Sequence, residues 1–435
     1  LRRIEMRVST TMQYRNHLSY LQGHNSRLDL ASQVYNTGKK FQTAGQDPGG
    51  MSAHMKYEAD IASYKQYTQN SKIVADTFAQ EETSLGQIYD ALSSVQTRLI
   101  QAVNGTLDDG SRAALAEDIK QVRDQIFNLM NTKNAEGEFI FSGAQSSIPT
   151  YVKNPDGTYV CQADGSNKYV NVSPTLTIQA NDSGLNIFEN TNLANDFRLS
   201  GKNKDDYLGT VRDYDEFNTF YKKYFNGNVD GQDPTVKDNR FKIEVLKGGK
   251  SFTVTDNAGN PIPPFDDPNY KGEIKDGKIN VFGMQFELKD GTKSPQPGDK
   301  INIILEPTKQ DNILNQLTNI ADALLVPQDE YGPNNIVSSS HDLTRQVAKM
   351  QENVNIAKKQ VDTFRGMVGA RGANIDAIIK SNESIHDIKK ESDANVVEAD
   401  AFTAVSDLMQ AQAALQVAQQ SYQVVHSATL FDFMR

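Results

Sequence analysis

"SDLMQAQAALQVAQQSYQVVHSATL", residues 406–430, has the heptad pattern of a helix that packs along another helix. Apolar or small residues recur three, four or seven positions apart, and this C-terminal stripe consists of Val397, Ala404, Leu408, Ala411, Leu415, Ala418, Tyr422 and Val425. Asp407 is the only charged residue between positions 402 and 430, whereas a coiled coil standing in water carries charges beside its seam. The sequence therefore predicts a helix that other helices enclose.

The N-terminal end of the chain carries a matching narrow stripe, which consists of Tyr14, Leu18, Leu21, Leu28 and Tyr35. Laying the two ends side by side is the simplest way to bury both stripes. Ordering about eighty terminal residues costs on the order of a hundred kcal/mol of chain entropy, while an alanine-lined seam gains only about 0.8 kcal/mol per buried methylene-sized group. We therefore expect the paired ends to be marginal alone and the two stripes to form an assembly interface.

Further helices are predicted on both sides of a different central part, since all but one of the fourteen prolines lie between positions 149 and 333. A second heptad runs through positions 57–99, a turn at 104–111 leads into a returning helix at 115–129, and apolar stripes cover 313–324 and 343–368. Gly45, Pro48, Gly49 and Gly50 are expected to lie in a loop between the first two helices. Residues 373–435 contain neither Gly nor Pro, so nothing there is expected to break a helix outright.

The central part alternates apolar and polar residues with the period of strands. "TYVKNPDGTYVCQ" (150–162) and "FKIEVLKGGKSFTVTD" (241–256) read as hairpins, and "KINVFGMQFELKDG" (278–291) and "GDKINIILEP" (298–307) as further strands. The predicted fold is α+β: both chain ends form a long antiparallel helical bundle or coiled coil, with an inserted antiparallel β-rich outer domain. The expected domains are a terminal coiled-coil assembly domain (1–45 with 395–435), a helical rod core (46–145 with 311–394) and the β-rich outer domain (146–310).

Composition and motifs argue against several classes of function. A net charge of -10 speaks against a nucleic-acid binder, and no apolar run is long enough to cross a bilayer or to act as a cleavable secretory signal. The scattered histidines form no metal-binding spacing, the acidic loop at 228–239 lacks the oxygen pattern of an EF-hand, and no phosphate-binding glycine motif follows a strand. Cys161 is expected to be a structural thiol, and the acidic pair Glu81 and Glu82 to be a solvated helix surface. We expect no catalytic residues, no metal and no cofactor.

Three segments at the ends of the chain resemble a known family. "MRVSTTMQYRNHLSYLQ" (6–22), "TGKKFQTAGQDPGGMS" (37–52) and "EADAFTAVSDLMQAQAALQVAQQSY" (398–422) are similar to the paired terminal regions of the bacterial flagellin superfamily. "NAEGEFIFSGAQSSIPTY" (134–151) and "GMQFELKDGTKSPQPGDKINI" (283–303) resemble segments of its hook-associated members. The resemblance covers roughly residues 6–151 and 311–434. Residues 1–5 precede the family's usual start at Met6 and are expected to be a remnant or an alternative start.

The resemblance implies a structural protein of an extracellular axial tube, located in the bacterial flagellum, whose terminal helices pair around a central channel. It implies export through the flagellar type III apparatus without a cleaved signal, and a cytoplasmic export chaperone. The implied neighbours are copies of the chain in a ring or helical tube, hook-associated protein 1 on one side and flagellin on the other. Nucleic acid and membrane insertion are not implied.

Two alternatives compete with an adaptor between helical polymers. The nearest is flagellin itself, which shares the terminal regions. The other is a surface-displayed hydrolase in the β insertion, although no histidine lies between His54 and His341 to act as a general base. The sequence favours the adaptor without catalysis.

Overall fold

The computed structural model describes residues 10–102, 108–189, 191–202, 204–227, 239–289, 294–326 and 340–433. The chain divides into two compact units, each built from segments that are distant in the sequence. Unit 1 combines residues 1–72, 171–176 and 376–435, and unit 2 combines residues 73–170 and 177–375. The turn predicted at 104–111 and the acidic loop predicted at 228–239 lie largely outside the described residues, as does the start of the chain before position 10.

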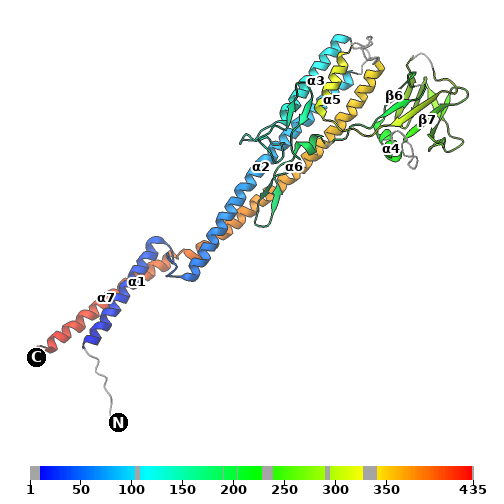
Figure 1. Cartoon of the computed structure of the whole chain (residues 1–435). Coiled ribbons are helices and arrows are strands. Elements are labelled where there is room, and N and C mark those ends of the chain that lie inside the picture. The colour runs from blue at the N-terminus through cyan, green and yellow to red at the C-terminus, as the bar shows by residue number, and fades with distance from the viewer. Residues whose placement is uncertain are drawn as a thin grey trace. The chain divides into compact units, whose positions relative to one another are not determined.

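Long helices come from both ends of the chain, as the heptad patterns predict (Figure 1). The helices are α1 (Thr10–Thr37), α2 (Pro48–Ala102), α3 (Asp109–Met130), α4 (Tyr214–Tyr224), α5 (Ile313–Leu325), α6 (Ser340–Val397) and α7 (Ala401–Phe433), together with a π-helical turn, η1 (Leu185–Glu189). In unit 2 the stripe of α2 is buried, with Phe78 2% exposed and Leu85, Leu92 and Leu99 fully covered. Helix α3 packs beside α5 in the same unit.

Two helix boundaries differ from the sequence prediction. Pro48 and the following glycines do not lie in a loop but form the first turn of α2, where Asp47 Oδ1 accepts the backbone N–H of Gly50 at 2.9 Å. Proline suits this position because the first helical N–H groups have no partner within the helix. The C-terminal end also contains a break, since α6 stops at Val397 and α7 starts at Ala401 without a glycine or proline. Asp400 supplies the signal, because its Oδ1 accepts the N–H of Thr403 at 2.8 Å and caps α7.

The strands between the helices are β1 (Tyr151–Lys153), β2 (Tyr159–Cys161), β3 (Tyr169–Asn171), β4 (Thr177–Gln179), β5 (Phe197–Ser200), β6 (Tyr207–Val211), β7 (Arg240–Val245), β8 (Ser251–Asp256), β9 (Gly272–Lys275), β10 (Lys278–Val281), β11 (Met284–Leu288) and β12 (Lys300–Leu305). Eight of them form an antiparallel sheet in the order β5-β12-β7-β8-β9-β10-β11-β6. The predicted hairpins are confirmed, with Tyr151 opposite Cys161 in β1–β2 and Val245 opposite Phe252 in β7–β8.

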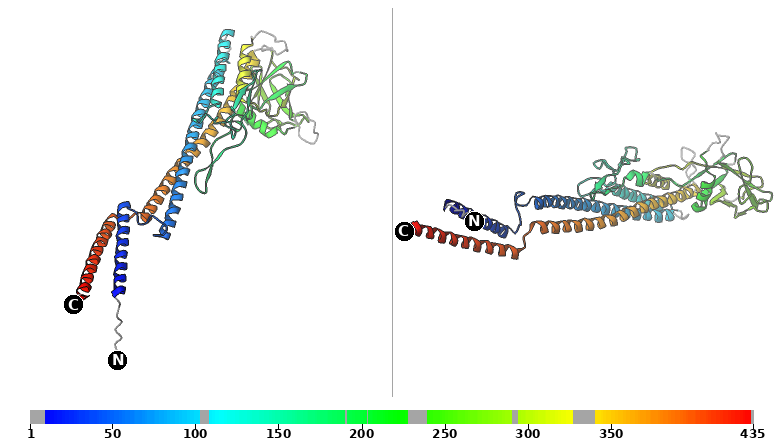
Figure 2. Two further views of the ribbon diagram at one scale, coloured as in Figure 1. Left: turned by 60° about the vertical axis from the view of Figure 1, so that its left-hand side comes forward. Right: turned by 90° about the horizontal axis from the view of Figure 1, so that it is seen from below.

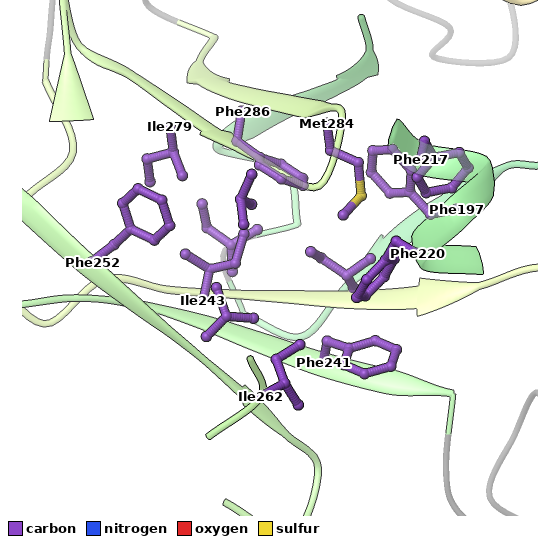
Figure 3. Close-up of a cluster of buried hydrophobic side chains, with 14 of the residues drawn as sticks. Phe197, Phe217, Phe220, Phe241, Ile243, Phe252, Ile262, Ile279, Met284 and Phe286 are labelled. Atoms are coloured by element: carbon purple, nitrogen blue, oxygen red, sulfur yellow. The ribbon is translucent and has the colours of Figure 1, made fainter. Parts of the chain in front are cut away.

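An aromatic core fills this sheet domain (Figure 3). Phe197, Phe241 and Phe286 come from strands, and Phe217 and Phe220 come from α4, which the sequence analysis missed inside the β-rich part. The segment before the sheet packs elsewhere, because Ile187 and Phe188 line a small cavity with Ile88 and Leu92 of α2. The predicted outer-domain boundary at position 146 therefore stays a prediction, while the sheet itself begins at β5.

Candidate assembly interface

Helices α1 and α7 of unit 1 lie side by side (Figure 1, Figure 2). The rings of Tyr14 and Tyr422 meet with centroids 6.1 Å apart, so the two predicted stripes face each other near the free ends of the helices. Ala404 is buried at the other end of α7. The structure thus brings together the N-terminal and C-terminal stripes of the sequence analysis.

Burial along the two stripes is incomplete. Val397 and Ala404 are 5% and 6% exposed, while Tyr14, Leu18 and Tyr35 remain 41–51% exposed. The half-buried members are Leu21, Leu28, Leu408, Ala411, Leu415, Ala418 and Tyr422. The side chain of Val425 lies outside the described residues. The pair α1–α7 alone leaves these apolar side chains partly in water. Burying their remaining apolar area would favour the binding of additional helices.

A groove of about 450 Å³ runs between α1 and α7. Its wall on α7 is made largely of small side chains, including Ala404, Ala411 and Ala414, and its wall on α1 includes Ala31 and Val34. Alanine leaves space between two helices that leucine would fill. The groove follows from the alanine-rich heptad and shows that α1 alone does not fill the surface of α7.

A second apolar stripe lies on the opposite face of α7, and the sequence analysis did not identify it. Phe402, Met409, Val417 and Val424 are 84%, 64%, 61% and 67% exposed. At about 100° per residue, their spacing of seven or eight positions places them on the side of the helix away from Ala404 and Leu408. The seven- and eight-residue spacing of this stripe is nevertheless present in the sequence. Helix α7 is therefore apolar on two faces, of which α1 covers one.

The connections that follow α1 and precede α7 are joined to each other. Lys40 N–H donates to Val397 O at 2.7 Å, and Ala399 N–H donates to Gly38 O at 2.8 Å. The two connecting segments therefore form a short antiparallel ladder. Gly38 adopts a φ of 67°, which is favourable for glycine at the end of a helix. Phe41, the residue after Lys40, is 5% exposed, and its ring lies close to Gly50 in the first turn of α2.

A buried carboxyl group in unit 2 corrects the interpretation of the acidic pair. Glu82 is exposed, but Glu81 is fully buried. Its Oε1 accepts the backbone N–H of Asp182 at 3.0 Å, its Oε2 has no hydrogen-bond partner, and the Asp182 carboxylate pairs with Arg371. Burial raises the pKa of Glu81 well above its usual range, and the negative charge of Asp182 raises it further, against the lowering effects of the Asp182 N–H and Arg371.

Neither a metal centre nor a membrane span is found in the part of the chain that the structure describes. No group of three or more His, Cys, Asp or Glu side chains is placed to hold a metal ion there. None of the described helices combines the length and apolar character needed to cross a bilayer. Cys161 is half-buried, and burial raises the pKa of its thiol, as suits a structural rather than a reactive cysteine.

Comparison with known families identifies the class of protein to which these terminal helices are similar. Residues 8–146 match the family described as the bacterial flagellin N-terminal helical region. This match contains α1, α2 and α3, and it confirms the resemblance to the flagellin superfamily that the sequence analysis stated.

The more particular similarity is to flagellar hook-associated protein 3. The chain is 30% identical to that protein of Escherichia coli (strain K12) over 173 residues, which are 40% of this chain and 54% of the relative. It is 28% identical to the Salmonella typhimurium protein of the same name over 185 residues, 42% of this chain and 57% of the relative. The chain thus spans just over half the length of these curated relatives. Flagellins also match, but over no more than 33% of the chain.

The fold agrees with that similarity. The crystal structure of flagellar hook-associated protein 3 from Legionella pneumophila superposes with a TM-score of 0.57 and 19% identity, covering 78% of this chain and 97% of that one. The predicted α+β architecture, with long terminal helices and an antiparallel β-rich part, is therefore confirmed. By their names, these relatives are flagellar proteins.

Proposed function

We propose that this chain is a structural adaptor of the bacterial flagellum that joins hook-associated protein 1 and the hook to the flagellin filament, and that it has no catalytic activity. The observation that carries the proposal is α7, an almost uncharged helix with apolar stripes on two faces and only one of them against α1. The similarity to flagellar hook-associated protein 3 supports the position at the junction.

The chemistry of α7 suits a helix surrounded by other chains. Burying a charged side chain without a partner costs several kcal/mol, whereas an uncharged surface avoids this cost. Six glutamines lie beside the stripes and can exchange hydrogen bonds with neighbouring helices: Gln410, Gln412, Gln416, Gln419, Gln420 and Gln423. The thirteen stripe residues named in the sequence analysis, from Tyr14 to Val425, form the proposed assembly interface, to which the second stripe adds Phe402, Met409, Val417 and Val424.

The proposal includes its partners and its route. Copies of the chain assemble in a ring or helical tube, hook-associated protein 1 lies on the hook side and flagellin on the filament side. A cytoplasmic chaperone holds the terminal helices before the flagellar type III apparatus exports the chain, without a cleaved signal, to the outside of the cell. Similarity to flagellar proteins supports these statements.

Deletion of the gene in its own bacterium tests the junction role. We expect cells with hooks but no filaments and with flagellin released into the medium, and we expect the full chain supplied in trans to restore filaments. Electron microscopy of the cell surface and immunoblotting of the medium give the two readings. Cells that still carry filaments of normal length would contradict the adaptor role.

A charge in the α1–α7 seam tests the interface. We expect Leu408→Asp with Leu415→Asp to abolish incorporation into the flagellum, because carboxylates at these half-buried positions would have to be desolvated among neighbouring helices. Gln87→Asp, at an exposed position of α2 in unit 2, introduces a carboxylate into a helix away from the seam and should still assemble. Circular dichroism should show that the helices of unit 2 persist in both proteins. Normal incorporation of the double variant would refute the interface.

Flagellin remains the alternative function, because flagellins also match this chain, at lower coverage. The two functions differ in whether the chain elongates indefinitely. A purified adaptor should add to hook ends and stop, whereas a flagellin would grow long filaments from seeds. Filament growth from this chain alone would favour flagellin.

A further inference from the structure

Most of the helix pair α2–α6 of unit 1 lacks an apolar core of its own, and buried Val397 at the end of α6 is the exception. Across residues 48–72 of α2 and 376–396 of α6, all of which the structure describes, no large apolar side chain is buried. Tyr57, Ile61 and Tyr64 continue the heptad of α2 but are only half-buried. The buried positions are polar instead: Ser71 is fully covered and Asn382 is 2% exposed.

Polar contacts hold much of this pair together. Lys389 Nζ lies 2.8 Å from Asp60 Oδ2, and Lys72 Nζ lies 2.9 Å from Glu383 Oε1. The Lys72 pair is about half exposed on both sides, and exposed ion pairs add little to stability because water screens them. A more covered pair, His54 Nδ1 with Asp393 Oδ1 at 2.7 Å, also joins the two helices, and the buried apolar side chain of this stretch comes from another part of the chain.

That part is the tip of the β3–β4 hairpin, residues 171–176. Asn382 Nδ2 donates to Val172 O at 2.8 Å, and Asn70 Nδ2 donates to Asn171 O at 3.2 Å, so α6 and α2 each hold one carbonyl of the tip. Between them the side chain of Val172 is completely buried. Ser71, the small residue in the apolar heptad of α2, directly follows Asn70 in the sequence. Val172 thus supplies the apolar side chain that the heptad lacks at this level.

Lys168 N–H donates to Asn181 Oδ1 at 2.7 Å and Lys168 Nζ lies 3.0 Å from Glu138 Oε2, and these contacts hold the base of the hairpin. Its β3 and β4 strands have three residues each, and Asn171 and Thr177, the strand residues that border the tip, are exposed. An isolated two-stranded hairpin is marginally stable at best in water. The tip therefore gains its order from the helices, and the helices gain their local core from the tip.

We propose that the β3–β4 tip is a reversible clasp on the α2–α6 pair of unit 1. When the clasp is seated, Val172 and the two asparagine amides hold the helices together. When it leaves, residues 48–72 of α2 and 376–396 of α6 lose the buried apolar side chain that the tip places against them, and they open locally. The clasp acts across 101 residues of sequence to α2 and 210 residues to α6, so this part of the helix pair closes only after the hairpin has formed. This conformational device is independent of the proposed junction role.

Native-state hydrogen exchange of the full-length monomer, read by mass spectrometry, tests the clasp. Val172→Ala removes buried methyl groups, and Thr175→Ala makes a closely similar truncation at an exposed position of the same tip. We expect Val172→Ala to accelerate exchange on the order of tenfold at 66–74 and 378–386, with no change at the α2 core residues 85–99. Thr175→Ala should leave all three segments unchanged.

Two outcomes would overturn the clasp. Unchanged exchange at 66–74 and 378–386 in Val172→Ala would show that the helices do not depend on the tip. Equal acceleration at 85–99 would show a general loss of stability rather than local opening. Because the monomer is measured, either result leaves the junction proposal untouched, and a failed assembly experiment leaves the clasp untouched.

Discussion

Replacing Glu81 by glutamine should stabilise the folded chain at neutral and alkaline pH. Glutamine keeps the shape of the side chain and an oxygen for the Asp182 N–H, which Glu81 Oε1 accepts at 3.0 Å. It puts an amide where Oε2 has no partner, and it removes the need to hold a proton on a buried carboxyl group beside Asp182. The natural residue therefore carries a cost that the variant avoids.

The pH dependence has a definite sign. The folded-state pKa of Glu81 lies above its value of 4.5 in the unfolded chain, so above pH 4.5 the unfolded chain releases a proton that the folded chain retains. The free energy of unfolding of the wild type then falls, by up to about 1.4 kcal/mol per pH unit, until the pH reaches the folded pKa. Below pH 4.5 the carboxyl group is protonated in both states and this cost is absent. The advantage of Glu81→Gln should grow from about zero at pH 4 to its largest value at alkaline pH.

Urea unfolding followed by circular dichroism between pH 4 and pH 9 measures this difference. Glu82→Gln serves as the control, since its carboxyl group is exposed on the next residue of the same helix and should show no comparable trend. A variant less stable than the wild type at pH 8 would refute the reasoning. So would an advantage of the same size at pH 4 and pH 8, because only the proton linkage makes it depend on pH.

Two further substitutions test local features of unit 2. Asn312→Ala should lower the free energy of unfolding by about 1–3 kcal/mol, because the buried side chain caps α5 and donates to Tyr159 O at 2.9 Å; thermal unfolding measures the loss, and an unchanged midpoint would contradict it. Gly283→Ala should destabilise the sheet domain by about 2 kcal/mol or more, since φ is 75° and a Cβ would lie 2.1 Å from Asp213 O. Gly259→Ala, with a φ of 92° and nothing within 4 Å, should cost less, and equal losses in the two variants would mean that the contact is harmless.

The sequence predicted the architecture wherever periodicity was strong. A strong period marks an element that buries one face. The helices α2 and α6 and the hairpins β1–β2 and β7–β8 were found as their periods predict. Helix α4 was missed because it is a single short helix among strands. Its signals were present: Asp213 caps it, and Phe217, Phe220 and Tyr221 follow at helical spacing.

Features that depend on distant parts of the chain were not predictable. The sequence around Glu81 does not indicate that it is buried. The charged groups that act on it, Asp182 and Arg371, are about one hundred and about three hundred residues away in the sequence. Ser71 is fully buried in α2, and its neighbour Asn70 binds the hairpin tip 101 residues away, a contact that the heptad does not indicate. In the candidate interface the pairing of the two stripes was predicted, whereas the second stripe of α7 was missed although its spacing is present in the sequence.

The ladder between residues 38–40 and 397–399 constrains how the chain can change during evolution. Its two hydrogen bonds, Lys40 N–H to Val397 O and Ala399 N–H to Gly38 O, require both connections to keep the same register. A residue gained or lost in one connection shifts its N–H and carbonyl groups away from their partners. Insertions and deletions at these two places are therefore expected to occur together among related chains, although more than 350 residues separate them in the sequence.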